Sequence, residues 1–213
     1  MDYRKAWELQ KSLFNNIVNS HSHNYLIITE HNPVITIGKT GSMDNLIADP
    51  SYLNAIGIDV IEIDRGGDIT FHGPGQLVGY PIIDLSQFRQ DIHWYLRNLE
   101  EVIIQTLNDF AIHGIRIPGL TGVWVKNNKI CAIGIKITRW VTMHGFALNI
   151  FTNLDYFKHI IPCGINDKGV TSIFEEIGNK VNMKDVIDRL CTNFEKIFET
   201  KILKTNTNHS EGY

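Results

Sequence analysis

Cys163 stands in a sequence context that could support nucleophilic chemistry. It follows Pro162, which restricts the approaching backbone, and it precedes Gly164, which leaves the following N–H accessible. A free thiol is mostly protonated at neutral pH, so a nucleophilic cysteine needs a nearby cation, a base or a helix N-terminus. Lys129 and His72 are the candidates for that role, and sequence spacing does not choose between them. Taken alone, the context of Cys163 suits a structural cysteine equally well.

The other two cysteines have contexts typical of small buried hydrophobic residues. Cys131 lies inside an apolar strand-like run, and Cys191 lies in the predicted last helix. Three cysteines at wide spacings match neither a disulfide framework nor paired zinc ligands, so we expect a reducing compartment and no metal. Five further histidines have surface-like contexts and are expected to be inert, namely His21, His23, His93, His113 and His159.

Residues 65–76 form the most unusual stretch of the sequence, with four glycines and one proline among twelve residues. Glycines allow a backbone to approach a ligand closely, while Arg65 and His72 supply a permanent charge and a titratable donor. Strand-like patterns flank the stretch on both sides, whereas dinucleotide and phosphate loops lead into a helix. The pattern therefore predicts a ligand-binding loop between two strands, and a long structural turn is the alternative.

Small residues interrupt two later strand-like runs. They could let an acyl chain lie against the sheet, and close packing of the backbones is the equally favoured alternative. The small residues are Gly134, Gly145 and Ala147, and the expected lining residues are Ile133, Phe146 and Leu148.

Periodicity along the chain predicts the elements that must position these residues. Apolar spacing indicates helices over residues 3–19, 50–56, 91–112 and 186–198. Short β-branched or alternating runs indicate strands over residues 25–29, 34–38, 58–63, 77–85, 122–125, 129–138 and 143–150, with Asn127-Asn128 as a hairpin turn. The strand over 25–29 is expected to be buried, and the long helix over 91–112 is expected to pack across the sheet. This mixture favours the α+β class with a mixed sheet.

Composition limits the class of protein further. The 213 residues, 43% of them hydrophobic, suit a single compact domain over residues 1–204, followed by a polar tail at 205–213 that we expect to be disordered. The net charge of −3 gives no reason to expect nucleic acid or a membrane as a partner. Neither a signal peptide nor a run of about 20 apolar residues is present, so a cytoplasmic location is expected.

Several ordered blocks of this sequence resemble the octanoyl-carrier-protein:protein octanoyltransferases of lipoate synthesis. The glycine-bearing stretch at 65–76, followed by Tyr80-Pro81, resembles the family signature. The later blocks keep the family order and lie at residues 129–134, 144–149, 162–164 and 170–172, with earlier ones at 30–33 and 36–38. Together they cover about residues 25–175, and five ordered blocks are far more specific than one glycine loop.

The resemblance implies roles for individual residues. It makes Cys163 the acyl-thioester nucleophile and Lys129 the group that lowers its pKa. The implied substrate contacts are Arg65, Gly66, Gly67, Asp68, Ile69, Thr70, Phe71, His72, Ala132, Ile133, Gly134, Gly145, Phe146 and Ala147, with supporting roles for His144, Gln76 and Tyr80. The expected fold is similar to that of biotin protein ligases and lipoate ligases.

The same resemblance implies the partners and leaves two rival functions. The octanoyl donor would be acyl carrier protein, which carries the chain on its own phosphopantetheine, so the enzyme itself needs no cofactor. The acceptor would be a lipoyl domain of a 2-oxoacid dehydrogenase E2 subunit or the glycine cleavage H protein. The rivals are an ATP-dependent lipoate-protein ligase, which does not need the Cys163 nucleophile, and a non-catalytic module that binds acyl chains or lipoyl domains.

Overall fold

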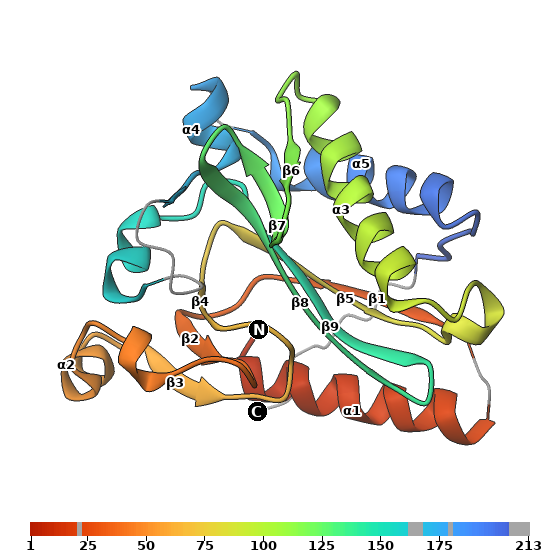
Figure 1. Cartoon of the computed structure of the whole chain (residues 1–213), viewed down its shortest axis with the longest axis horizontal. Coiled ribbons are helices and arrows are strands. Elements are labelled where there is room, and N and C mark those ends of the chain that lie inside the picture. The colour runs from red at the N-terminus through yellow and green to blue at the C-terminus, as the bar shows by residue number, and fades with distance from the viewer. Residues whose placement is uncertain (21–22, 162–167, 179–180, 205–213) are drawn as a thin grey trace.

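Two β-sheets organise the chain in the computed structural model, which describes residues 1–20, 23–161, 168–178 and 181–204 (Figure 1). Within these residues the larger sheet has the strand order β1-β5-β9-β8-β7-β6, with β10 pairing with β8, and the smaller sheet has the order β3-β2-β4. The expected α+β class with a mixed sheet is confirmed. The predicted turn at 162–164, with Cys163, and the predicted tail at 205–213 lie outside the described residues.

Most strands coincide with the predicted ones. The larger sheet contains β1 (Tyr25–Thr29), β5 (Gln76–Ile82), β6 (Ile115–Ile117), β7 (Leu120–Val125), β8 (Asn128–Thr138), β9 (Val141–Asn149) and β10 (Gly169–Val170). The smaller sheet contains β2 (Val34–Ile37), β3 (Asp59–Glu62) and β4 (Ile69–His72). Strands β4, β6 and β10 were not predicted, and two of these three are only two or three residues long.

The predicted helices are present, with shifts at their ends. The helices are α1 (Tyr3–Ser20), α2 (Pro50–Ala55), α3 (Ile92–Asn108), α4 (Ile173–Ile177) and α5 (Met183–Ile197), with short 3₁₀ turns η1 (Met43–Asn45), η2 (Leu85–Gln87) and η3 (Leu154–His159). Helix α3 begins where the Asp91 side chain accepts a hydrogen bond from the Trp94 N–H. It ends at Asn108, earlier than predicted, and the chain then turns at Ala111, whose φ is 58°.

Helices cover the larger sheet on both faces (Figure 1). Helices α3 and α5 pack on one face, where Leu99 and Leu190 share a core with Cys131 and Leu148 of the sheet. Helix α1 packs on the other face, against Val78 and Ala147. The prediction that the long helix packs across the sheet is therefore confirmed, and alternate residues of each central strand face different helices.

The glycine-bearing stretch at 65–76 differs from the prediction of a single loop. Its middle residues form β4, which pairs antiparallel with β2 in the smaller sheet. The side chains of Ile69 and Phe71 belong to the core of the smaller sheet, whereas Thr70 is less buried and His72 is buried against Gln76 of β5. Glycines flank this short strand on both sides, and they had obscured its β-prone residues.

Two smaller predictions were also wrong. Strand β1 is only partly buried along its whole length, because it lies at the edge of the larger sheet and pairs with β5 alone. The hairpin between β7 and β8 turns at Lys126-Asn127 rather than one residue later, since Val125 pairs with Asn128 and Lys126 has a φ of 53°.

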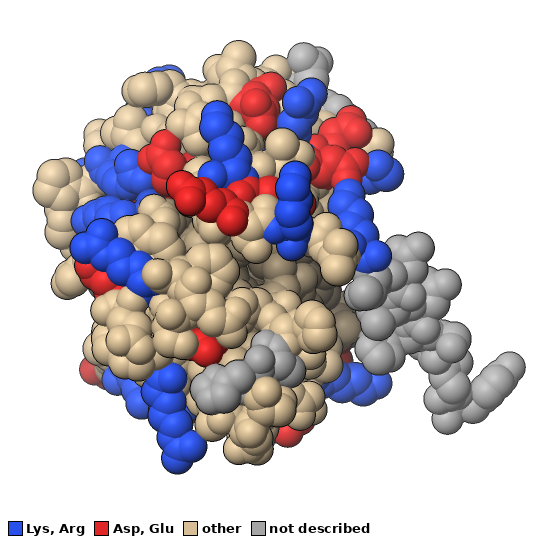
Figure 2. Space-filling view, turned by 90° about the vertical axis from the view of Figure 1, so that its right-hand side faces the viewer, with Lys and Arg blue, Asp and Glu red and all other residues tan. Residues whose placement is uncertain are grey.

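The charged surface is mixed rather than one-sided. On the face seen in Figure 2, lysine and arginine side chains are interspersed with aspartate and glutamate side chains, especially in its upper half. Among the described helices, none is both long and apolar enough to cross a lipid bilayer.

Candidate functional site

A cavity of about 390 Å³ opens between the larger sheet, the smaller sheet and the start of α1. Its volume falls within the usual range of small-molecule sites, about 300–1,000 Å³. The predicted site residues that line it are Arg65, Gly67, Asp68, Ile69, Thr70, His72, Gln76, Tyr80, Lys129, Ala132, Ile133, Gly134, His144, Gly145, Phe146 and Ala147. Residues distant in sequence thus meet at one site.

Two of the predicted substrate contacts do not line the cavity. Phe71 belongs to the core of the smaller sheet, where its ring stacks on Tyr156. Gly66 donates its N–H to the carbonyl of Ile135 at 2.8 Å, so it ties the two sheets together. The positions of both residues favour a structural role.

A strip of small side chains forms the floor of the cavity on the larger sheet. Ala132 pairs with Ala147, and Gly134 pairs with Gly145, in the antiparallel register of β8 and β9. Since residues two apart share a face, these four residues lie on the same side of the sheet. Leu148 had been expected to line an acyl chain, but it lies on the opposite face, in the core beneath α3.

Gly134 is required because the Arg65–Gly66 backbone crosses directly over it. A methyl group at Gly134 would lie 2.8 Å from the carbonyl oxygen of Gly66 and 2.9 Å from Cδ of Arg65. Both distances are shorter than carbon contacts allow, and the oxygen belongs to a backbone that Ile135 holds in place. The small side chain therefore permits the two sheets to close over one end of the cavity.

We expect Gly134→Ala to reduce the free energy of unfolding by about 1–3 kcal/mol, the usual cost of overpacking. The Michaelis constant for a substrate bound in this cavity should also rise, because the Arg65 backbone must move away from the cavity floor. Urea denaturation and steady-state kinetics measure the two effects. Thr138→Ala, at the exposed end of the same strand, is the control, and equal values for the two variants would contradict the prediction.

A chain of buried hydrogen bonds connects the two sheets along the cavity wall. Arg65 donates from Nη2 to the carbonyl and the hydroxyl oxygen of Thr36, both at 3.0 Å. The Thr36 hydroxyl lies 3.3 Å from His72 Nε2, and His72 Nδ1 lies 2.8 Å from Gln76 Oε1. Gln76 in turn donates to Asn149 Oδ1 at 2.9 Å. Every side chain in this series of hydrogen bonds is buried.

The chain of hydrogen bonds continues to the segment that follows residues 162–167. Asn149 donates from Nδ2 to the carbonyl of Thr171 at 3.0 Å, and the Thr171 N–H donates to the carbonyl of Lys129 at 3.0 Å. Strand β10 pairs in parallel with the start of β8, so that Val170 lies opposite Lys129. Both Val170 and Lys129 line the cavity.

His72 is held neutral in one tautomer. Gln76 uses its NH₂ group to donate to Phe71 and Asn149, so its oxygen accepts, and Nδ1 of His72 must carry the proton. Burial, together with the nearby His31 and Arg65, lowers the pKa of His72 to about 3. At neutral pH, Nε2 is therefore an acceptor for the Thr36 hydroxyl, and His72 is unsuited to supply a positive charge.

The buried histidine makes stability depend on pH. The His72 pKa rises from about 3 in the folded protein to about 6.5 in the unfolded chain, so the unfolded chain binds the proton first as the pH falls. The contribution of neutral His72 to the free energy of unfolding is fully present above about pH 6.5. It decreases below that pH, by roughly 2 kcal/mol at pH 5. His72→Gln should weaken this dependence in urea denaturation at pH 5–8 and leave the part that comes from His31 and His144, whose pKa values burial also lowers to about 4, whereas the exposed His93→Gln should leave it unchanged. Identical profiles for the two variants would contradict the prediction.

Lys129 reaches the cavity because β8 contains a bulge. The register with β7 shifts between Cys131, opposite Val123, and Lys129, opposite Trp124, so Ile130 is an extra residue on β8. The side chains of Ile130 and Cys131 both enter the core beneath α3. The alternation is reversed beyond the bulge, and Lys129 therefore shares the cavity face with Ala132 and Gly134.

The Lys129 side chain is nearly buried, at 9% exposed. Its ammonium group lies 4.8 Å from the centre of the Trp124 ring, in a cation–π contact. Cys131, two residues along, is fully buried, and this burial raises the pKa of its thiol. The predicted structural role of Cys131 agrees with this position, and Cys191 is buried as well.

His144 lies at the other end of the small-residue floor. Its Nε2 is 2.9 Å from Asp64 Oδ1, and Lys136 contacts the second oxygen of Asp64 at 2.5 Å. Burial alone would raise the pKa of Asp64, but the hydrogen bonds from Lys136 and His144 outweigh it and hold the value at about 2. Burial lowers the pKa of His144 to about 4, so this ring donates to the carboxylate as a neutral group.

Sequence reasoning missed several residues of this site. Tyr3, at the start of α1, stacks on His72 with ring centroids 5.8 Å apart and lines the cavity. His31 Nε2 is 2.7 Å from the hydroxyl of Tyr80. Thr36 and Asn149 complete the buried hydrogen bonds. His31, Thr36 and Asn149 all lie in blocks that resemble the family, and this was a usable signal. For Tyr3 the sequence holds none.

Comparisons with known proteins match nearly the whole chain. Residues 2–195 match the family model of the lipoyl protein ligase A/B catalytic domain. An octanoyltransferase from Cytophaga hutchinsonii is 48% identical over an alignment of 229 positions, gaps included. The alignment covers 99% of this chain and 93% of that relative.

Two solved structures share the fold. A crystal structure of lipoate-protein ligase A bound with ATP has a TM-score of 0.74 at 17% identity, covering 92% of this chain and 83% of that one. Biotin protein ligase from Aquifex aeolicus, in complex with biotin and ATP, has a TM-score of 0.52 at 14% identity, covering 77% and 70%. The expected similarity of fold to lipoate and biotin ligases is thus confirmed.

Proposed function

We propose that Cys163 carries the octanoyl group as a thioester between donor and acceptor. This chain belongs to the octanoyltransferases of the lipoyl protein ligase A/B catalytic domain family. The protein transfers octanoyl groups in protein lipoylation. The observation that best supports the cysteine route is the position of Lys129. Its buried side chain lines the cavity beside β10, which begins two residues after the segment at 162–167.

The first half-reaction is an exchange of thioesters. The thiolate of Cys163 attacks the carbonyl carbon of the octanoyl thioester, and the bond from that carbon to the donor sulfur breaks. The leaving thiolate of phosphopantetheine takes a proton from the Lys129 ammonium group. The octanoyl group is then bonded to Cys163, the donor leaves as a thiol, and Lys129 is neutral.

The second half-reaction is aminolysis. The lysine of the acceptor loses a proton to solvent and attacks the new thioester as a neutral amine. Neutral Lys129 takes the second proton of that amine, and the thiolate of Cys163 leaves. The products are an amide on the acceptor and the original pair of Cys163 thiolate and Lys129 ammonium, so no ATP is consumed.

The floor of the cavity suits the apolar chain. Its side chains are small, since it consists of Ala132, Gly134, Gly145 and Ala147. Val78 on β5 lies beside them. An octanoyl group can lie over Ala132 and Ala147 with its carbonyl at the Lys129 end and its methyl group toward Gly134, where the Arg65–Gly66 backbone closes the strip. Arg65 lies over the strip and closes it from the side of the smaller sheet.

The partners follow from the reaction. Octanoyl transfer in lipoylation requires an acyl donor and a lipoyl-domain acceptor. We infer that the donor is octanoyl acyl carrier protein and that the acceptor is a lipoyl domain of a 2-oxoacid dehydrogenase E2 subunit or the glycine cleavage H protein. The enzyme itself needs no cofactor for these steps, because the donor brings its own phosphopantetheine.

Intact-protein mass spectrometry tests the proposal. The purified protein is incubated with octanoyl acyl carrier protein in the absence of ATP, and the adduct is located by peptide mapping. We expect one octanoyl group on Cys163 that disappears when a lipoyl domain is added. Transfer that proceeds without any adduct on Cys163 would support direct transfer instead, and a requirement for ATP would favour ligase chemistry.

A further inference from the structure

We propose that Glu100, a buried residue of α3 outside the cavity, is a positioning residue that holds Lys129 in place through the backbone of β7. This inference rests on the proposed role of Lys129. The carboxylate anchors Gly122, Gly122 packs against the bulge in β8, and the bulge turns Lys129 toward the cavity.

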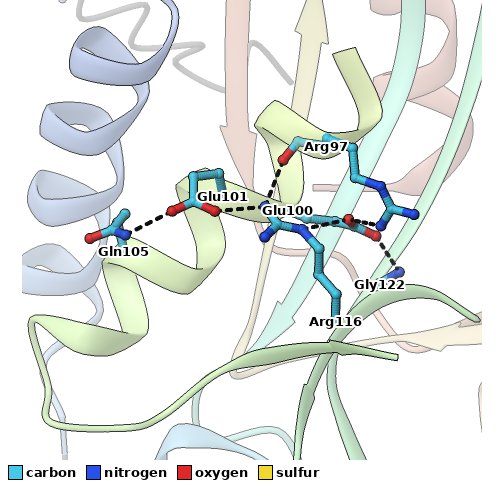
Figure 3. A network of polar contacts seen from close by, with 6 residues as sticks. All are labelled: Arg97, Glu100, Glu101, Gln105, Arg116 and Gly122. Carbon is cyan, nitrogen blue, oxygen red and sulfur yellow. Dashed lines mark hydrogen bonds and ion pairs between the residues drawn. The ribbon is translucent and has the colours of Figure 1, made fainter. Parts of the chain in front are cut away.

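The surroundings of Glu100 are unusual for a carboxylate. Its side chain is fully buried, on the face of α3 that packs Leu99 and Ile103 against the sheet. Three donors surround it (Figure 3): Arg97 Nη1 at 2.6 Å, Arg116 Nε at 3.0 Å and the N–H of Gly122 at 3.2 Å. A buried carboxylate needs such partners, because losing water costs several kcal/mol.

The two arginines neutralise the carboxylate of Glu100, and the hydrogen bond from the third donor, the Gly122 N–H, fixes the backbone of β7. Arg97 is half exposed, and Arg116 also binds Glu101 at 2.7 Å and the carbonyl of Arg97 at 3.0 Å. These contacts would hold Arg116 without Glu100. The N–H of Gly122 has Glu100 Oε1 as its acceptor, and this bond is the direct link from α3 to the backbone of β7.

Gly122 has a backbone conformation that an ordinary residue rarely adopts. Its φ is 116°, and a methyl group on it would lie 2.6 Å from the carbonyl oxygen of Cys131. The same methyl position is 3.6 Å from Cε of Lys129. Gly122 therefore packs against the carbonyl of Cys131 and beside the Lys129 side chain, next to the register shift between Val123 and Trp124.

The residues just before Gly122 connect this anchor to the cavity wall. Gly119, Leu120 and Thr121 line the cavity, and Arg116 lies on β6 in the same hairpin. Glu100 thus fixes both the hairpin wall and the strand that supports Lys129. A leucine would serve the packing between helix and sheet, so what the carboxylate adds is the acceptor for the Gly122 N–H.

Substitution of Glu100 by residues of similar size tests the inference. Glu100→Leu removes the acceptor, whereas Glu100→Gln keeps an oxygen but places a donor among donors. We expect kcat for octanoyl transfer to fall about tenfold or more in Glu100→Leu, with an intermediate loss in Glu100→Gln and little change in KM. If Glu100→Leu does not fold, the comparison of Glu100→Gln with the unmodified protein decides. Equal kcat values would overturn the proposal.

Glu101→Gln is the matched control. Glu101 is the next residue on α3 and binds the same arginine, but its contacts to Arg116 and Gln105 do not include Gly122. This variant should keep kcat within about twofold. A loss equal to that of Glu100→Leu would overturn the proposal, because it would show a general dependence on the arginine network.

A double-mutant cycle with Lys129→Met separates positioning from stability. The readout is the rate at which iodoacetamide alkylates Cys163 as a function of pH. If Glu100 acts through Lys129, Glu100→Leu raises the pH midpoint in the unmodified background and has no further effect in Lys129→Met. An undiminished effect in the Lys129→Met background would overturn this inference alone. A normal midpoint in Lys129→Met itself would instead contradict the proposed role of Lys129.

Discussion

Cys163→Ala is expected to lower the rate of octanoyl transfer by a factor on the order of 10⁴ or more, because it removes the sulfur atom that we propose bonds to the acyl chain. Binding of the chain along Ala132, Gly134, Gly145 and Ala147 should survive, since these residues belong to the described sheet. The variant should therefore still bind the octanoyl donor while failing to form the adduct. Single-turnover transfer and a binding measurement on the same sample test both parts.

The chain supplies two matched controls for this substitution. Cys131 and Cys191 are both buried, and burial raises the pKa of each thiol, so neither is a ready nucleophile. Cys131→Ala and Cys191→Ala should keep the rate of transfer within a few-fold if the variants remain folded. Transfer at an unchanged rate in Cys163→Ala would refute the covalent route and favour direct attack of the acceptor lysine on the donor.

Lys129→Met is expected to lower kcat by roughly 10²–10³-fold, the usual contribution of a well-placed acid–base group. Methionine keeps most of the apolar stem that lies beside Gly122 and removes the ammonium group over the Trp124 ring, so the local packing should be retained while the charge is lost. Both half-reactions should slow, because in the proposed route Lys129 protonates the leaving thiolate in the first step and deprotonates the attacking amine in the second. Rapid-quench measurements of adduct formation and adduct consumption resolve the two steps.

Lys136→Met is the control for the loss of a lysine from the same strand. Lys136 pairs with Asp64, and its side chain is about a third exposed. This variant should retain transfer within a few-fold. If Lys129→Met slows only the second step, then a different group protonates the leaving thiol, and the double role of Lys129 would be wrong.

The neutral His72 and the nearly buried Lys129 have different proposed roles at this site. His72 has a strongly lowered pKa and links Thr36 to Gln76, so it joins the smaller sheet to the larger one. Sequence reasoning held both residues as candidates to activate Cys163. The hydrogen bonds of His72 favour a positioning role for it, and they leave Lys129 as the candidate cation.

Much of the fold could be predicted from local patterns. The helix at α3 and the strands at β8 and β9 follow from residue spacing, since a helix or strand presents its apolar side chains at a regular period. Strand β4 could not be recognised in this way, because four residues between glycines are too few to establish a period. Its pairing with β2, far along the chain, is what defines it.

The sequence by itself determined the class of reaction, and it supplied the prediction of which residues react. Ordered blocks of residues can be recognised without coordinates, and they predict Cys163 and Lys129 as the reacting residues. Only the tertiary structure decided how Lys129 reaches the cavity. Plain alternation along β8 would place Ile130 with Ala132 on the cavity face, but one extra residue in the bulge reverses that order. A bulge depends on the partner strand and on the distant Glu100 that anchors it, and a local period contains neither.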